Sequence, residues 1–305
     1  MTFHLHGNIL TASGIASNNR GKSNSNIANL HKFKWKQRKT YTRISSEAIR
    51  WALRYYWQEM GYAVYRFWDA NEQKYIEQDS HDPDKYIDDD VMGYLELEAT
   101  KKEVNDSSKS KNKTKKSPQK PIQRTGVLKV TSAVSLLPYF GDVTFNARAG
   151  EKDETSLYGS EYHATRYQYG FSLTPKRLVK TSRILQILDG LISLYEVGGN
   201  HSRFLYDFAA ESLIFRWTHD VCPRILYSFD EDLQGNISVP DLVWNLQTQN
   251  IAPHELWIGG RIADSLSDTE AHTFVRIEEM VEHLKRVITE DLELNNNDES
   301  ANSTS

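Results

Sequence analysis

The strongest constraint on the fold is a change of periodicity between residues 32 and 56. Basic residues first alternate with aromatic ones, a pattern typical of a strand that places Lys32, Lys34 and Lys36 on one face. Apolar residues then recur at helical spacing, at Ile49, Ala52, Leu53 and Tyr56. Ser45 is a suitable N-cap, and Gly61 is a suitable end. The sequence therefore predicts a basic strand that leads into a helix from Ser46 to Met60.

The same stretch has a strong local charge. Ten Lys or Arg residues lie between Arg20 and Arg54, against one acid, Glu47. A helix N-terminus presents backbone N–H groups and partial positive charge, which suit a phosphate. Two interpretations stay open: a surface for an anionic partner, or a solvated edge strand whose lysines prevent aggregation.

Composition limits the class of protein. The 305 residues include 39% hydrophobic and 26% charged residues, which is typical of a globular protein with an ample core. The net charge of −4 combines a basic N-terminal half with an acidic stretch from Glu290 to Glu299. The single cysteine, Cys222, excludes an internal disulfide and fits a reducing compartment. No apolar run approaches the length of a membrane span, so we expect a cytoplasmic protein without a membrane partner.

One low-complexity segment interrupts the chain. Residues 101–121 contain eight lysines and little apolar content, so we expect them to be disordered. Strand-like segments flank this run at 91–99 and 124–137, which predicts an insertion within one domain rather than a linker. The acids Asp88, Asp89 and Asp90 precede the first of these strands, and we expect a solvated turn because a metal site would need further ligands.

The remaining segments alternate between strand and helix patterns. Strands are predicted at 3–10, 62–67, 162–173, 204–208, 213–217 and 224–229, and helices at 181–195, 241–249 and 268–292. Residues 138–159 are rich in turn residues and aromatic side chains, which predicts a protruding hairpin or loop. The pair His4 and His6 has no third ligand at supporting spacing, so we expect no metal and no cofactor.

This order of elements predicts the fold class. It fits an α+β fold with a β-α-β-β-α-β core of the RRM-like, or ferredoxin-like, type that carries large insertions. We expect a single domain over residues 1–292 with the insertion at about 101–121, followed by a disordered acidic tail at 293–305.

Four segments resemble one protein family. They are the first strand with His6-Gly7-Asn8, the helix start RISSEAIR at 43–50, the strand that opens with RTGV at 124–127, and the loop GGNHSR at 198–203. In this order they resemble the Cas-seven family, and more narrowly its DevR-type branch from type I-B CRISPR systems. The resemblance extends from Thr2 to about Arg224.

The resemblance implies a function. Members of this family form the backbone of Cascade, an RNA-guided complex that finds DNA targets, and several copies stack head to tail along one guide RNA. The resemblance implies a hand-shaped domain with inserted fingers and a thumb, in which the 101–120 insertion is a finger that faces target DNA. The expected partners are guide RNA, target DNA, further copies of the chain, subunits of the Cas-five, Cas-six and Cas-eight types, and in some systems transposition proteins.

Together, the basic run and the resemblance indicate which residues contact RNA. The expected RNA-binding residues are Arg20, Lys22, Lys34, Lys36, Arg38, Arg43, Ser45, Ser46, Arg50, His163, Arg166, Asn200, His201 and Arg203. The expected thumb residues are Tyr139, Phe140, Phe145 and Arg148. A guide held by its backbone keeps its base edges free, so the protein should recognise shape and charge rather than sequence.

Two other functions are alternatives to this scaffold. An RNA-processing nuclease of the RRM-like class would need a general base near a 2′-hydroxyl, and His31, His163 or His201 are the candidates. None of them has an acidic partner at a fixed spacing. A DNA-binding regulator would need a recognition helix, and no segment supports one. We therefore expect a non-catalytic guide-RNA-binding subunit.

Overall fold

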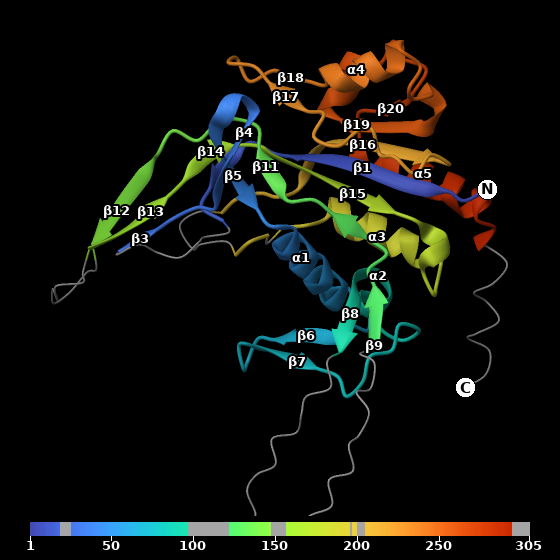
Figure 1. The fold of residues 1–305 in the computed structure, drawn as a ribbon, viewed down its shortest axis with the longest axis horizontal. Coiled ribbons are helices and arrows are strands. Elements are labelled where there is room, and N and C mark those ends of the chain that lie inside the picture. The colour runs from blue at the N-terminus through green and yellow to red at the C-terminus, as the bar shows by residue number, and fades with distance from the viewer. Residues whose placement is uncertain (19–25, 97–121, 148–156, 196, 200–204, 295–305) are drawn as a thin grey trace, which may run out of the picture.

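A nine-stranded sheet forms the centre of the molecule. The computed structural model describes residues 1–18, 26–96, 122–147, 157–195, 197–199 and 205–294. The main path of the sheet runs β20-β19-β16-β1-β15-β11-β5-β4, and β10 pairs with β15 beside it (Figure 1). These strands are β1 His4–Thr11, β4 Lys32–Trp35, β5 Lys39–Ile44, β10 Lys129–Val130, β11 Ala133–Ser135, β15 Tyr167–Leu173, β16 Ala210–Thr218, β19 Leu256–Gly260 and β20 His272–Phe274. The pairing is antiparallel except between β19 and β20.

Both faces of the sheet are covered. Alternation along β16 sends Leu213, Phe215 and Trp217 into one core and Ile214 into a second. The first core lies under α1 Ser46–Glu59, α3 Arg183–Ile192 and α5 Ile277–Asp291. The second core lies under α4 Pro240–Gln247 and the 3-10 segment Arg261–Leu266. Figure 1 shows α1 and α3 on one side of the sheet and α4 on the other.

Two helices connect the four central strands. Along the chain the order is β1, α1, β11, β15, α3, β16, and in the sheet the strands lie in the order β16-β1-β15-β11. The β1–β15 register sets Leu5 opposite Leu173 and Ile9 opposite Tyr169, so that apolar side chains of both strands pack under α1 and α3. The chain is therefore a mixed fold of one large sheet and several helices.

The helices predicted at 46–60, 181–195 and 241–249 are confirmed with small shifts of their ends. Three strand predictions are wrong, and the strand predicted at 62–67 begins only at Arg66. The segment 124–137 is broken into β9 Ile122–Thr125, β10 and β11. The stretches 205–208 and 224–229 pair with no strand, although Ile225 and Phe229 are buried in the second core. The last helix begins at Ile277 rather than Asp268 because β20 takes part of the preceding residues into the sheet.

The three consecutive acids lie in a buried helix, so the expectation of a solvated turn is wrong. They belong to α2 Ile87–Met92, and each has a cationic or histidine partner. Asp88 pairs with Arg54 at 2.9 Å, and Asp89 pairs with His81 at 2.9 Å. Asp90 is fully buried and pairs with Arg124 and with Arg183, the latter at 2.7 Å. Paired charges of this kind can be buried, whereas isolated ones cannot.

Two strands mark the base of the long insertion. β8 Gly93–Glu96 pairs in an antiparallel register with β9, from Gly93 opposite Thr125 to Glu96 opposite Ile122. This pairing places the two ends of the run between Glu96 and Ile122 on neighbouring strands. The lysine-rich run itself and the acidic tail from residue 295 lie outside the described residues.

Smaller strand pairs complete the fold. They are β12 Val143–Ala147 with β13 Leu157–Glu161 and β3 Ile27–Ala28, β14 His163–Thr165 with β2 Gly14–Ala16, β6 Arg66–Asp69 with β7 Lys74–Glu77, and β17 Asp230–Glu231 with β18 Ile237–Ser238. Among the described residues, none of the helices combines the length and the apolar content that a bilayer crossing requires.

Candidate nucleic-acid interface

The predicted basic strand forms one edge of the sheet. In β4, Phe33 and Trp35 are half-buried while Lys32 and Lys34 are exposed, as alternation predicts. Lys32 Nζ lies 2.6 Å from Glu161 Oε1, and Lys34 Nζ lies 2.6 Å from Thr40 Oγ1 on the paired strand β5. Lys34 therefore makes a side-chain contact to the paired strand β5, and Lys32 connects β4 to Glu161 of β13.

Lys36 departs from the predicted face. It opens a 3-10 turn, Lys36–Arg38, in which Gln37 and Arg38 have positive φ angles of 54° and 59°. The ammonium group of Lys36 pairs with Asp230 of β17, whereas Lys32 and Lys34 contact Glu161 and Thr40. The prediction of three ammonium groups on one face is wrong for Lys36 because the strand ends at Trp35.

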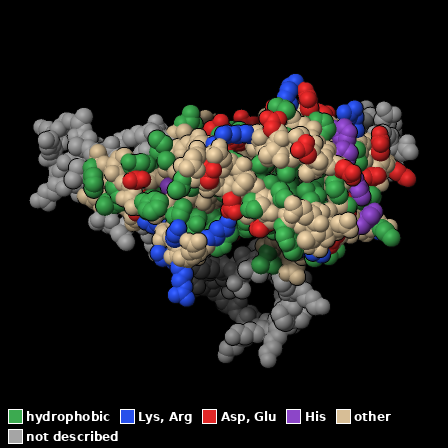
Figure 2. All heavy atoms as spheres, turned by 90° about the horizontal axis from the view of Figure 1, so that it is seen from above, with side chains coloured by type: hydrophobic (Ala, Val, Ile, Leu, Met, Phe, Trp, Pro, Cys, Tyr) green, Lys and Arg blue, Asp and Glu red, His purple; other side chains and the backbone are tan. Residues whose placement is uncertain are grey.

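The exposed cations of this region form a continuous stretch of chain. We define the basic edge as Lys34, Lys36, Arg38, Lys39 and Arg43, all of which are exposed. Figure 2 shows Lys and Arg side chains toward the end of the molecule that carries the β12–β13 hairpin. Lys39 was not among the predicted residues, although its place within the same basic run could have indicated it.

The start of α1 is capped by Ser45. Its Oγ accepts a hydrogen bond from the Ala48 N–H at 3.2 Å, and Ser46 is the first helical residue. Arg50 lies one turn further on and donates to the carbonyl oxygen of Met92 at 2.7 Å. Its half-buried guanidinium thus donates to the last residue of α2, and the contact of Arg50 with a phosphate stays a prediction.

The expected thumb is a hairpin beside the basic edge. Figure 1 shows β12 and β13 projecting from the side of the sheet that ends in β4. Phe140 is 88% exposed and Phe145 is 64% exposed, which is unusual for phenylalanine. These two rings are available for stacking.

Tyr139 has a different position from the two phenylalanines. Its backbone N–H donates to Thr40 O at 2.8 Å, and Lys32 Nζ lies 4.8 Å from the centre of its ring. Burial, followed by the charge of Glu161, raises the pKa of its hydroxyl above the usual value. Tyr139 therefore joins the root of the hairpin to β4 and β5. Arg148 lies outside the described residues.

His163 is buried between strands and does not reach the surface. It is 5% exposed, and its Nδ1 lies 2.8 Å from Thr42 Oγ1. Burial lowers the pKa of its imidazole to about 4. We correct the expectation that His163 contacts RNA, since a buried neutral ring offers no charge to a phosphate.

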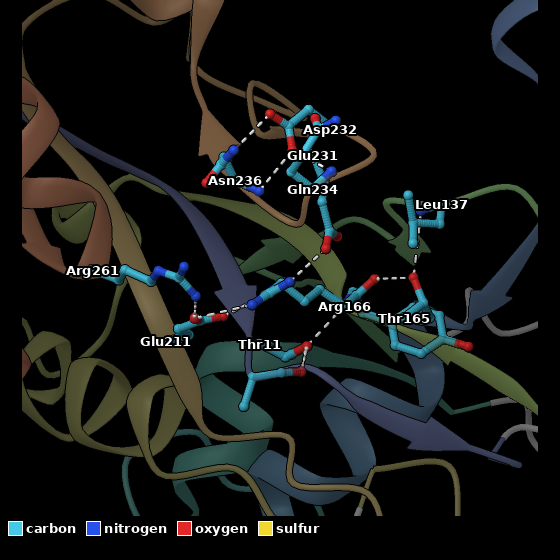
Figure 3. Close-up of polar contacts among 12 residues, drawn as sticks. Thr11, Leu137, Thr165, Arg166, Glu211, Glu231, Asp232, Gln234, Asn236 and Arg261 are labelled. Atoms are coloured by element: carbon cyan, nitrogen blue, oxygen red, sulfur yellow. Dashed lines mark hydrogen bonds and ion pairs between the residues drawn. The ribbon is translucent and has the colours of Figure 1, made fainter.

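Arg166 is the centre of a buried ion network (Figure 3). Its Nε lies 2.6 Å from Glu211 and its Nη1 lies 2.6 Å from Glu231, while Arg261 approaches Glu211 at 3.2 Å. The side chain is 8% exposed. These bonds attach the β17–β18 hairpin to β15 and β16, so the expected RNA contact of Arg166 is corrected as well.

The other predicted residues lie outside the described part of the chain. They are Arg20, Lys22, Asn200, His201 and Arg203. Gly198 and Gly199 just before the last three are described, and both have positive φ angles, 76° and 74°. Among the described residues no group of three His, Cys, Asp or Glu side chains is arranged to hold a metal ion.

Comparisons with known proteins place the chain. No family model matches it. It is 36% identical over 286 residues to the CRISPR-associated protein Cas7/Cst2/DevR of Myxococcus xanthus (strain DK1622). The aligned residues cover 88% of this chain and 90% of that protein. The chain belongs to the Cas7/Cst2/DevR family. The predicted membership of the Cas-seven family is therefore confirmed.

The fold of this Cas7/Cst2/DevR chain resembles that of a solved structure. A chain of a "CRISPR RNA-guided surveillance complex, pre-nicking" has a TM-score of 0.58 at 9% identity, and the match covers 93% of this chain and all of that one. A chain of a second CRISPR RNA-guided surveillance complex has a TM-score of 0.47 at 12% identity, over 85% of this chain and 88% of the other. The first match shows that this mixed fold occurs in an RNA-guided complex.

Proposed function

We propose that this Cas7/Cst2/DevR protein is a non-catalytic backbone subunit that binds guide RNA in a CRISPR surveillance complex and supports binding of target DNA. One observation carries the proposal: the basic edge lies at the root of a projecting hairpin that exposes Phe140 and Phe145. Proteins that bind single strands without sequence preference combine cations, which contact the phosphate backbone, with aromatic rings, on which the bases stack.

The covered faces of the sheet limit where RNA lies. Helices α1, α3 and α5 bury one face, and α4 with its neighbours buries the other. The guide therefore runs along the β4–β5 edge and the hairpin rather than across the sheet. The order β16-β1-β15-β11, with α1 and α3 as connections, supports an RRM-like core within this proposal.

The partners follow from the same role. A backbone subunit binds further copies of itself along the guide and meets other Cascade subunits at its ends, in agreement with the surveillance complex in which the matching fold occurs. Target DNA pairs with base edges that a backbone-held guide exposes. Transposition proteins remain a possible further partner of such a complex in some systems.

His163 is not suited to act as the general base that the nuclease alternative requires. His163 is 5% exposed and lies against Thr42, so it cannot meet a 2′-hydroxyl. We therefore propose that guide RNA mixed with the purified protein stays intact.

The proposal is tested by salt-dependent RNA binding. The double variant Lys34→Ala, Arg38→Ala should weaken binding of unrelated single-stranded RNAs to a similar extent. If each cation contacts one phosphate, the slope of log affinity against log salt should fall by roughly 1.4. The matched control is the double variant Arg276→Ala, Arg286→Ala, which removes the same charge from exposed positions at α5. An unchanged slope in the first variant, or equal losses in both, contradicts the proposal.

The thumb is tested separately. Phe140→Ala should cost about 1–3 kcal/mol of RNA binding if the ring stacks on a base. Tyr75→Ala removes another exposed aromatic ring from the β6–β7 hairpin and serves as the control. Equal RNA affinities of the wild-type protein and Phe140→Ala would exclude the proposed stacking.

A further inference from the structure

A groove lies at the opposite edge of the sheet from the basic edge. It has a volume of about 420 Å³ and opens between the ends of β16, β19 and β20 and the last turns of α5. Cavities of this size hold small ligands or single side chains of a partner. Since β20 and β4 are the two outer strands of the main path, the groove is separate from the proposed RNA site.

Aromatic rings line the groove in fixed positions. Phe3 stacks on Trp217, with ring centres 4.6 Å apart and planes at 3°. Trp257 stacks on His272 at 4.5 Å. The indole N–H of Trp217 donates to Asp291 at 2.7 Å, and that of Trp257 donates to His283 Nδ1 at 3.0 Å. Both indoles are thereby held in place before any partner binds.

The charge around the groove is negative. Asp291 is exposed, and within the described residues its carboxylate accepts the Trp217 hydrogen bond and forms no ion pair. Glu255, on the other side, pairs with Arg216 at 2.7 Å and is 21% exposed. The helix α5 carries five acids and two bases, and its carbonyl end, with partial negative charge, lies at Asp291.

His272, which lines the groove, does not cancel this charge at neutral pH. Burial, and then the neighbouring His283, lower the pKa of His272 below its usual value. His283 accepts the Trp257 N–H through Nδ1, which requires that nitrogen to be unprotonated. Figure 2 shows histidine side chains near this end of the molecule with acidic side chains beside them.

We propose that the groove is a docking site for an arginine side chain of a partner protein. A guanidinium packs against aromatic rings and donates to carboxylates at the same time. Trp217 and Trp257 are buried, so the rings that the groove offers to a partner are those of the half-buried Phe3 and His272, near the exposed Asp291. The phosphates of RNA or DNA would instead meet Asp291 and the acidic α5, so charge complementarity favours a basic protein segment. This surface adds a protein contact to the proposed RNA-binding role and does not depend on it.

The test uses N-acetyl-arginine-N-methylamide as the probe and the full chain labelled with ¹⁵N. Indole N–H signals report directly on Trp217 and Trp257, and Trp257→Phe identifies its own signal. We expect saturable shifts of both signals with the arginine probe. The citrulline analogue has a similar shape without the charge, and we expect it to bind about tenfold more weakly.

Two variants of equal charge change complete the test. Asp291→Asn keeps an oxygen acceptor for the Trp217 N–H but removes the carboxylate, and we expect about tenfold weaker arginine binding. Glu290→Gln changes an exposed acid that does not line the groove and should bind as the wild type does. Absence of saturable shifts, equal binding of citrulline, or shifts produced instead by uridine monophosphate would each overturn the proposal. Because none of these readouts involves guide RNA, failure here leaves the RNA-binding proposal standing, and the converse also holds.

Discussion

Buried His163 makes the stability of the protein depend on pH in a predictable window. Its ring is 5% exposed, contacts Thr42 Oγ1 at 2.8 Å, and has a pKa lowered to about 4 because burial disfavours the imidazolium. In the unfolded chain the same ring has a pKa of about 6.5. The unfolded state therefore binds a proton more readily than the folded state, and the folded state loses stability as the pH falls from 6.5 toward 4.

The magnitude follows from the separation of the two pKa values. Each pH unit between them corresponds to about 1.4 kcal/mol, so the folded state loses about 2 kcal/mol between pH 7 and pH 5 through this group alone. Below pH 4 the loss levels off at about 3 kcal/mol. His163→Gln cannot take up a proton at this position, so its stability should fall by about 2 kcal/mol less than that of the wild type over the same interval.

Urea unfolding followed by tryptophan fluorescence measures this difference. Wild type and His163→Gln are each unfolded at pH 7 and pH 5, and the comparison cancels the contributions of all other groups. His254→Gln replaces an exposed histidine and controls for the change of residue type. Parallel pH dependences of wild type and His163→Gln would refute the argument, because they would mean that position 163 titrates alike in both states.

Three further perturbations test the fold by thermal or urea unfolding. Asp90→Ala should cost about 3–5 kcal/mol, because it leaves two arginines without their carboxylate partner, whereas the exposed Asp264→Asn should change little. Ser45→Ala should cost about 1 kcal/mol through loss of the helix cap, and Ser45→Asn, which keeps an acceptor, should recover most of it. Gly93→Ala should cost at least about 2 kcal/mol, because φ at this position is 68° and a Cβ would overlap the carbonyl oxygen of Arg124. Gly61→Ala should cost less, because φ is 79° there but no atom lies near the position of the Cβ. A stable Asp90→Ala, a harmless Ser45→Ala, or equal losses at the two glycines would each contradict the corresponding argument.

Local signals determined how much of this fold the sequence could predict. Helix α1 was predictable because its cap, Ser45, and its buried stripe, Ile49, Ala52 and Leu53, lie within a few residues of one another. At the base of the insertion, the strand predicted at 91–99 is shortened to β8, whereas β9 was predicted only as the start of one long strand at 124–137.

The failures have a common physical cause in distant partners. From the sequence alone we expected Asp90 to face solvent, because its partner Arg183 lies 93 residues further along the chain. Arg166 was likewise predicted to lie at the surface, because its partners Glu211 of β16 and Glu231 of β17 are distant in the sequence. The sequence shows the charge of a residue. Whether that charge pairs within its own chain or is available to another molecule depends on the tertiary structure.

The same distinction limits the prediction of the interface. Lys36 continues the alternation of the strand in the sequence, yet in the structure it begins a 3-10 turn. The turn contains no glycine, although Gln37 and Arg38 have positive φ angles, so the sequence does not indicate it. Phe140 and Phe145, in contrast, were recognisable because aromatic residues within a turn-rich segment have no core to enter. The exposure of these two aromatic rings was thus easier to predict than the conformation at Lys36.

The anchored base of the insertion has a consequence for how such proteins vary. The ends of the run between Glu96 and Ile122 are held opposite each other by β8 and β9, and Asp90 ties Arg124 of β9 to α2 and α3. With its ends fixed, a loop can double in length for only about 0.6 kcal/mol of closure entropy. Changes in the length of the run between Glu96 and Ile122 should therefore leave the sheet undisturbed, and an epitope or fluorophore placed there should leave the fold unchanged.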